Sequence, residues 1–160
     1  MTTGPSGEAG AAASPRILVF STHNVSDPGI DLAGSAHVDY PVGVRVIALP
    51  CSSGLDPRWV VHAFEVGFDG VFVAADGTDC SKIADCPART GKIVARAQEL
   101  LRDAGYEPAR VKMAAVCSVC AEPFAAHMRK FAAELAKLPR PSRLPAPAPV
   151  PARVALTASV

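Results

Sequence analysis

The sequence lacks an excess of charge of either sign. Its 160 residues include 16 lysines and arginines against 15 acidic residues, which gives a formal net charge of +1. No basic region is available to bind a phosphate backbone, and this argues against nucleic acid as a partner. The chain also has no GxGxxG motif, no P-loop and no Ser/His/Asp pattern, so hydrolase and nucleotide-enzyme functions have little support.

Long apolar runs are missing as well. No stretch approaches the ~20 apolar residues that a membrane-spanning helix requires. The N-terminal sequence MTTGPSGEAGAAASPR has no basic segment followed by an apolar one, so we expect no signal peptide. These absences predict a cytoplasmic protein without a membrane partner, whose five cysteines stay reduced by default. Clustered cysteines then indicate metal binding or redox chemistry more than structural disulfides.

Composition divides the chain into one folded unit and two terminal segments. Residues 1–14 consist mainly of Gly, Ala, Ser and Thr, and residues 139–160 begin with a run rich in Pro and Ala. We predict that both segments are disordered. The remaining residues, 15–138, are enough for one domain with a hydrophobic core.

Four short apolar runs rich in β-branched residues are typical of strands: Arg16–Phe20, Val44–Leu49, Gly70–Ala74 and Val111–Val116. Their lack of strict alternation predicts strands that are covered on both faces. Helical patterns lie between and after them, near residues 27–33, 56–67, 93–105 and 123–138. This order predicts an α/β fold: a four-stranded, mostly parallel, doubly wound sheet, flavodoxin- or Rossmann-like, with helices on both faces.

All five cysteines fall just beyond predicted strands. Cys51 follows the second strand, Cys80 and Cys86 lie in the long loop after the third, and Cys117 and Cys120 follow the fourth. In a parallel sheet these loops emerge at the same edge, so we expect three separate segments to bring five thiols together. Thiolates at one site repel each other unless a cation, such as zinc or the iron of a cluster, neutralises them.

The cysteine pattern leaves several kinds of site open. Cys117 and Cys120 form a CxxC pair, which suits two ligands of one metal centre but also a dithiol relay. A closed zinc site built from three loops is an alternative, and Cys51 or Cys86 taken singly could be a small core residue. His23, in the loop after the first strand, is a further candidate ligand or hydrogen-bond donor.

A series of short motifs follows in a fixed order along the folded unit. They are ILVF at 17–20, GIDLAG at 29–34, YP at 40–41, VRVI at 44–47, CS at 51–52 with DP at 56–57, AFExGxDGV at 63–71, and DC at 79–80. In order and spacing they resemble the delta, iron–sulfur subunit of methyl-viologen-reducing hydrogenase, a family also found with heterodisulfide reductase. The resemblance runs from about Ile17 to about Phe131.

This resemblance implies a [2Fe–2S] cluster and two kinds of partner. The electron donor would be a hydrogenase or formate dehydrogenase module, and the acceptor would be a flavoprotein of the heterodisulfide reductase A type. Cys51 and Cys80 match cysteines that the family uses. The family's CxxC-like pair after the first strand is absent from residues 21–26 here, and Ala75 stands where the family has another cysteine.

Three cysteines, Cys86, Cys117 and Cys120, are additional to the family pattern. Lost sites and new thiols on the same edge suggest a relocated ligand set. We predict Cys51, Cys80, Cys117 and Cys120 as ligands, with Cys86 replacing Cys51 as the main variant. By ligand count, a [4Fe–4S] cluster is allowed as well.

Three functional hypotheses follow. The first is an electron-transfer subunit of an oxidoreductase complex, with catalysis located in other subunits. The second is a structural zinc or docking module of such a complex. The third is a thiol redox or sulfur-transfer protein that acts through Cys117 and Cys120.

Overall fold

A computed structural model describes residues 14–77, 83 and 85–141 of the chain. Most positions of the two terminal segments predicted to be disordered lie outside this part, and so does Cys80. The proposed domain boundaries therefore stay predictions. Strands and helices within the described residues alternate in the order that the sequence predicts.

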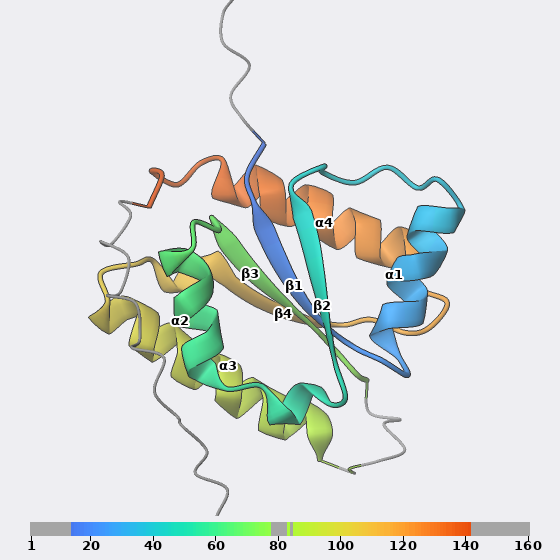
Figure 1. Ribbon diagram of the computed structural model, residues 1–160, viewed down its shortest axis with the longest axis horizontal. Helices are drawn as coiled ribbons and strands as arrows, with labels where there is room; N and C mark the ends of the chain where they lie inside the picture. Colours follow the sequence, from blue (N-terminus) through green and yellow to red (C-terminus); the bar gives the residue numbers. More distant parts are fainter. Residues whose placement is uncertain (1–13, 78–82, 84, 142–160) are drawn as a thin grey trace, which may run out of the picture.

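The centre of the fold is a parallel sheet in the order β2-β1-β3-β4 (Figure 1). The strands are β1 (Ile17–Thr22), β2 (Val44–Leu49), β3 (Gly70–Ala75) and β4 (Val111–Ala115). The register pairs Ile17 with Val44 on one side and with Gly70 on the other. The predicted four-stranded parallel sheet is thus confirmed.

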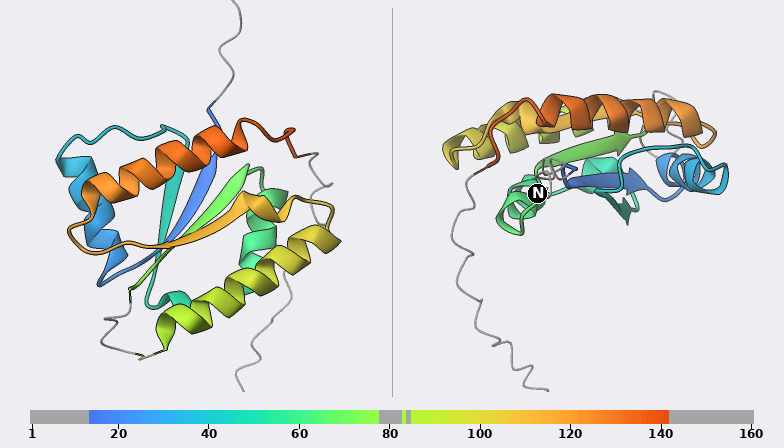
Figure 2. Two further views of the ribbon diagram at one scale, coloured as in Figure 1. Left: turned by 180° about the vertical axis from the view of Figure 1, so that it is seen from behind. Right: turned by 90° about the horizontal axis from the view of Figure 1, so that it is seen from above.

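Helices cover both faces of the sheet. On one face lie α1 (Ser26–Ser35) and α4 (Ala121–Leu135), and on the other lie α2 (Pro57–Glu65) and α3 (Cys86–Asp103) (Figure 2). Side chains of β1 alternate between two hydrophobic cores: Val19 joins the core under α1 and α4, and Phe20 joins the core under α2 and α3. This alternation confirms the doubly wound α/β arrangement.

The two central strands differ from the two edge strands in burial. Every residue of β1 and β3 is buried, whereas β2 and β4 expose several side chains, among them Ile47 and Met113. The expectation that all four strands are covered on both faces is therefore wrong for β2 and β4. Each edge strand has a neighbour on one side only, and the helix layers do not extend over its outer margin.

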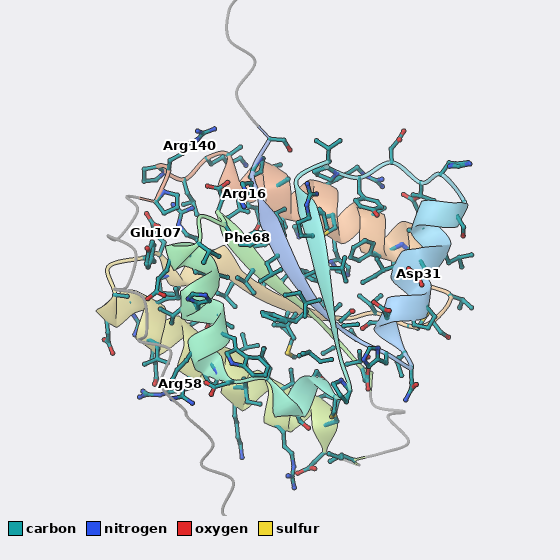
Figure 3. All side chains as sticks on the ribbon, viewed as in Figure 1. Arg16, Asp31, Arg58, Phe68, Glu107 and Arg140 are labelled. Atoms are coloured by element: carbon teal, nitrogen blue, oxygen red, sulfur yellow. A yellow bond between two sulfur atoms is a disulfide. The ribbon has the colours of Figure 1, made fainter. Side chains whose placement is uncertain are left out.

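Local signals set the limits of α2 and α3. Asp56 caps α2 by accepting a hydrogen bond from the backbone N–H of Arg58, whose side chain points to the outer side of the helix (Figure 3). Side-chain hydrogen bonding from Arg58, followed by that backbone bond, lowers the pKa of Asp56 from 3.8 to about 2. Gly67 (φ 93°) and Gly105 (φ 83°) take the left-handed conformation that ends the two helices.

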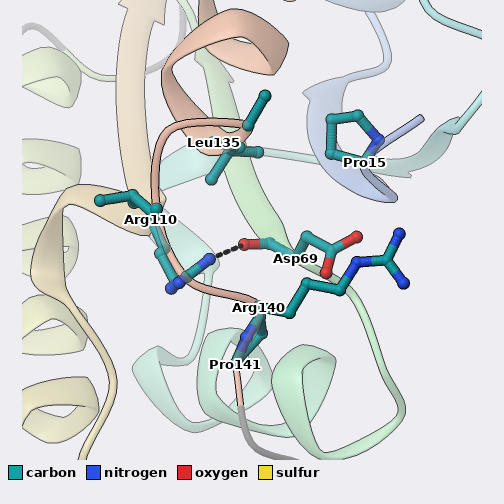
Figure 4. A pocket seen from close by; sticks show the side chains of 8 residues that line it. Pro15, Asp69, Arg110, Leu135, Arg140 and Pro141 are labelled. Carbon is teal, nitrogen blue, oxygen red and sulfur yellow. Dashed lines mark hydrogen bonds between the residues drawn. The ribbon is translucent and has the colours of Figure 1, made fainter. Parts of the chain in front are cut away.

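A buried arginine ties the amino edge of the sheet to the segment after α4. Arg110 is 1% exposed and donates to the carbonyl of Asp69 (Figure 4). It also donates to the carbonyl of Pro139 and to the carboxylate of Glu107. Its side-chain hydrogen bond lowers the pKa of Glu107. A cavity of about 110 Å³ lies here, at the end of the sheet opposite the cysteines.

None of the helices in the part of the chain that the structure describes combines the length and the hydropathy that are needed to span a bilayer.

Candidate redox site at the carboxyl edge of the sheet

A buried polar cluster fixes the carboxyl ends of the two central strands. Thr22, the last residue of β1, donates its hydroxyl to Asp76 beyond the end of β3. Its backbone N–H donates to Oγ of Ser26 over 2.7 Å, and Ser26 in turn donates to the carbonyl of Ala74 over 2.8 Å. All these side chains are buried. The cluster therefore joins β1, β3 and the first turn of α1 into a rigid base for the neighbouring cysteine loops.

Cys51 and Cys86 approach each other on the α2 and α3 side of this edge. Cys51 follows β2 and precedes a short 3₁₀ turn, Ser52–Gly54, that packs against α3, while Cys86 is the first residue of α3. Their Sγ atoms are 3.9 Å apart, and both thiols are free. Residues 35 positions apart in sequence are thus brought together, as the topology predicts.

Hydroxyl groups surround this pair. Ser53 Oγ lies 3.0 Å from the sulfur of Cys51, and Ser52 Oγ lies 3.5 Å from the sulfur of Cys86. Ser52 also contacts the hydroxyl of Thr90 over 3.0 Å, one turn further along α3. Cys86 and Thr90 have no exposed surface, and Cys51 is half-buried. The two sulfurs therefore lie in a small polar enclosure with access from the Cys51 side.

Cys117 and Cys120 form a separate pair on the opposite face. They are joined by a disulfide bond, with the Cα atoms 5.0 Å apart. The expectation that all five cysteines stay reduced is wrong for these two, because the turn between β4 and α4 brings their sulfurs into bonding contact. The carbonyl of Cys117 faces α1 at Gly29, and Cys120 packs against the core under α1 and α4.

The structure thus sorts the four described cysteines into two pairs. Cys51 follows one edge strand and Cys117 follows the other, and three strand spacings correspond to about 14 Å between those strand ends. Among the described residues, no group of three or more His, Cys, Asp or Glu side chains is gathered closely enough to hold a metal ion. His23 is exposed at the end of β1 and joins no such group. Because Cys80 lies outside the described residues, the predicted four-cysteine ligand set stays a prediction.

Comparison with known proteins identifies the family. The family model for "Methyl-viologen-reducing hydrogenase, delta subunit" matches residues 17–139, most of the chain. The chain belongs to this family. The resemblance noted in the sequence is thereby confirmed.

Curated relatives of this delta subunit family carry descriptive names. An iron–sulfur subunit of the F420-non-reducing hydrogenase of Archaeoglobus profundus is 30% identical over 129 residues, which cover 78% of this chain and 90% of the relative. An iron–sulfur subunit of the vhu F420-non-reducing hydrogenase of Methanocaldococcus jannaschii is 29% identical, with 78% and 92% covered. The A component of the ferredoxin:CoB-CoM heterodisulfide reductase of Methanosarcina mazei is 27% identical over 78% of this chain but only 16% of its own length. This chain therefore also matches a segment of a much larger protein.

The donor chemistry of the Cys51 and Cys86 pair fits an iron–sulfur cluster. Two thiolates on one tetrahedral metal, each at about 2.3 Å from it, are about 3.8 Å apart. The observed separation of 3.9 Å between the two sulfurs needs almost no rearrangement to match this value. The enclosing hydroxyls would supply hydrogen bonds to the sulfurs, the kind of contact that raises a cluster's reduction potential.

Proposed function

We propose that this delta subunit family member is an electron-transfer protein that holds an iron–sulfur cluster at the carboxyl edge of its sheet. The single observation that carries the proposal is the 3.9 Å approach of Cys51 and Cys86 in a family whose relatives are named iron–sulfur subunits. The cluster supplies one-electron redox chemistry when bound. This chain would provide its ligands, its partial burial and its surrounding hydroxyls.

Cys51 and Cys86 would be the first two ligands of the cluster. Cys80 would be the third, because it lies in the segment that connects β3 to Cys86, and a non-cysteine donor would complete the four ligands. The alternative is the set Cys51, Cys80, Cys117 and Cys120, which requires that the disulfide be reduced and that the two faces be brought closer. We favour a [2Fe–2S] cluster on family likeness, with [4Fe–4S] as the alternative.

Partners of the proposed electron carrier would be a hydrogenase- or formate-dehydrogenase-type donor and a flavoprotein of the heterodisulfide reductase A type, in the cytoplasm. The match to a segment of the A component of a heterodisulfide reductase supports the second partner. A suitable contact surface lies beside β2, where an apolar groove of about 500 Å³ exposes Ile47, Trp59 and Val66. Leu49 also lines this groove and lies two residues before Cys51, so a partner bound there would lie close to the cluster.

Anaerobic purification of the full chain tests this function. Stoichiometric iron and acid-labile sulfide are expected, with a visible absorption that dithionite bleaches reversibly. Colourless protein with one zinc per chain would instead support a structural zinc or docking module. Colourless protein without any metal would contradict the proposal.

A further inference from the structure

We propose that Cys117 and Cys120 form a dithiol–disulfide redox centre of their own, separate from the cluster at Cys51 and Cys86. Its substrates would be dithiol–disulfide couples, with which it would exchange two electrons at a time. The inference goes beyond the proposed electron-transfer function and does not depend on a cluster being present. It removes Cys117 and Cys120 from the predicted ligand set.

The placement of the bond favours exchange over a purely structural role. The two cysteines are three positions apart in sequence, so the bond closes a very short loop. A cross-link restricts the unfolded chain less as the closed loop becomes shorter, and this one therefore contributes little to stability. The fold is already held at this point by the packing of Phe124 and Met128 in the core under α4.

The two cysteines also differ in exposure. Cys117 is exposed, and so are the next two residues, with Val119 at 76% of its full exposure. Cys120 is half-buried, and its carbonyl accepts a hydrogen bond from the N–H of Phe124 at the start of α4. An incoming thiolate can therefore reach the Cys117 sulfur, while Cys120 is positioned as the leaving group.

The supporting loop is held in place by α1. A Cβ atom added at Gly29 would lie 2.2 Å from the carbonyl oxygen of Cys117 and 3.4 Å from the backbone nitrogen of Cys120. Only glycine therefore lets the helix backbone come this close. The N–H of Cys120 donates to the carbonyl of Cys117 over 3.1 Å, which keeps the two residues in one turn.

The exchange balances in atoms and electrons. A thiolate of the reducing dithiol attacks Sγ of Cys117, the Cys117–Cys120 bond breaks, and Cys120 leaves as a thiolate that takes up a proton. The second thiol of the reductant then attacks the reductant sulfur that is bonded to Cys117 in the mixed disulfide. This step releases Cys117 as a thiolate, which is protonated in turn. The pair has gained two electrons and two protons, and the reductant has become a disulfide.

The probe for this centre is the dihydrolipoamide–lipoamide couple. The full chain is equilibrated anaerobically with mixtures of the two forms, alkylated, and analysed by mass spectrometry. Cys117 and Cys120 are expected to become alkylated together, and excess lipoamide is expected to reverse the reduction. A bond that stays oxidised in the folded chain and opens only in denaturant would overturn the proposal.

Two matched variants test the assigned roles. In the variant Cys120→Ser, the exposed Cys117 should react with glutathione disulfide to form a stable mixed disulfide. In the variant Cys117→Ser, the half-buried Cys120 should react with glutathione disulfide roughly ten times more slowly, because access limits exchange. Equal rates would contradict the assignment of Cys117 as the attacked sulfur. Gly34→Ala, at an exposed position of α1 where a Cβ meets nothing within 4 Å, should leave the reactions of both cysteines unchanged.

Iron content separates this inference from the proposed function. The double variant Cys117→Ser/Cys120→Ser should keep the iron of the unmodified chain, because the two replaced cysteines are not ligands. Loss of iron in the double variant would overturn the inference and favour the predicted set Cys51, Cys80, Cys117 and Cys120. If the unmodified chain binds no iron, the electron-transfer function fails, while the lipoamide titration still decides whether the dithiol centre exists.

Discussion

Gly29 and Gly34 lie on the same helix but have opposite surroundings. Gly29 is buried against the backbone of the Cys117–Cys120 turn, whereas a Cβ at the exposed Gly34 would meet nothing within 4 Å. A backbone carbonyl cannot move aside as a flexible side chain can. The residue at position 29 therefore controls how closely α1 approaches the CxxC turn.

Alanine at these two positions should have effects of opposite sign. Gly29→Ala is expected to lower the free energy of unfolding by roughly 1–3 kcal/mol, because the new methyl group overlaps the Cys117 carbonyl. Gly34→Ala should raise it by about 0.5–1 kcal/mol, because the unfolded chain loses freedom and the helix gains a better former. Urea unfolding followed by circular dichroism measures both values. A change of the same sign in the two variants would contradict the close approach of α1.

Individual residues also show what the sequence could not reveal. The carboxyl-edge location of the cysteines was predictable, because parallel strands place their following loops at one edge. The pairing was not, since that rule does not say to which face each loop turns: the segment after Cys51 turns to α3, and the segment after Cys117 turns to α1. No spacing pattern links Thr22 to Asp76, so their buried hydrogen bond was missed.

At the level of elements, strands and helices were predicted wherever apolar residues mark them. The limits of β2 agree with the prediction, but β1 extends past Phe20 to Thr22. The added residues, Ser21 and Thr22, are polar, and their pairing with β2 and their hydrogen bonds at the buried edge explain their place in the strand. Helix α3 likewise starts at Cys86, before its apolar stripe, because its first turns pack against the Ser52–Gly54 turn through the buried Cys86 and Thr90.

The N-terminal cap of α2 should make the stability of this helix depend on pH. The folded-state pKa of Asp56 is lowered from 3.8 to about 2. The contribution of the charged cap to the free energy of unfolding is therefore complete above pH 3.8 and is lost as the pH falls through about 2. Asp56→Ala should therefore lower the free energy of unfolding at neutral pH. The difference in this free energy between the variant and the unmodified chain should shrink in this acid range. Urea unfolding at a series of pH values measures that difference.

Two further variants serve as controls for the cap. Asp56→Asn should preserve capping, since asparagine is as good an N-cap, but without the acid-dependent loss. Arg58→Gln removes the largest cause of the lowered pKa, so the loss of the cap should begin at a higher pH. A stability difference between Asp56→Ala and the unmodified chain that is independent of pH would contradict the charged cap.

At the scale of the whole molecule, the amino edge and the carboxyl edge of the sheet have different roles. The amino edge is closed by buried Arg110 and its bonds to Asp69, Glu107 and Pro139, which are structural. The carboxyl edge carries both cysteine pairs, one on each face of the sheet. With the apolar groove beside β2 leading to Cys51, this arrangement suits a small protein that contacts a larger partner near its redox groups.

The most direct test of the cluster assignment is the iron content of the double variant Cys51→Ser/Cys86→Ser. This content is measured per chain after anaerobic purification and compared with that of the unmodified chain. Serine matches the size of both cysteines and the hydroxyl-rich surroundings formed by Ser52, Ser53 and Thr90, so the fold should persist and can be checked by circular dichroism. We predict that the double variant loses the iron, the acid-labile sulfide and the visible absorption. A folded double variant that retains all three would contradict a cluster held by Cys51 and Cys86.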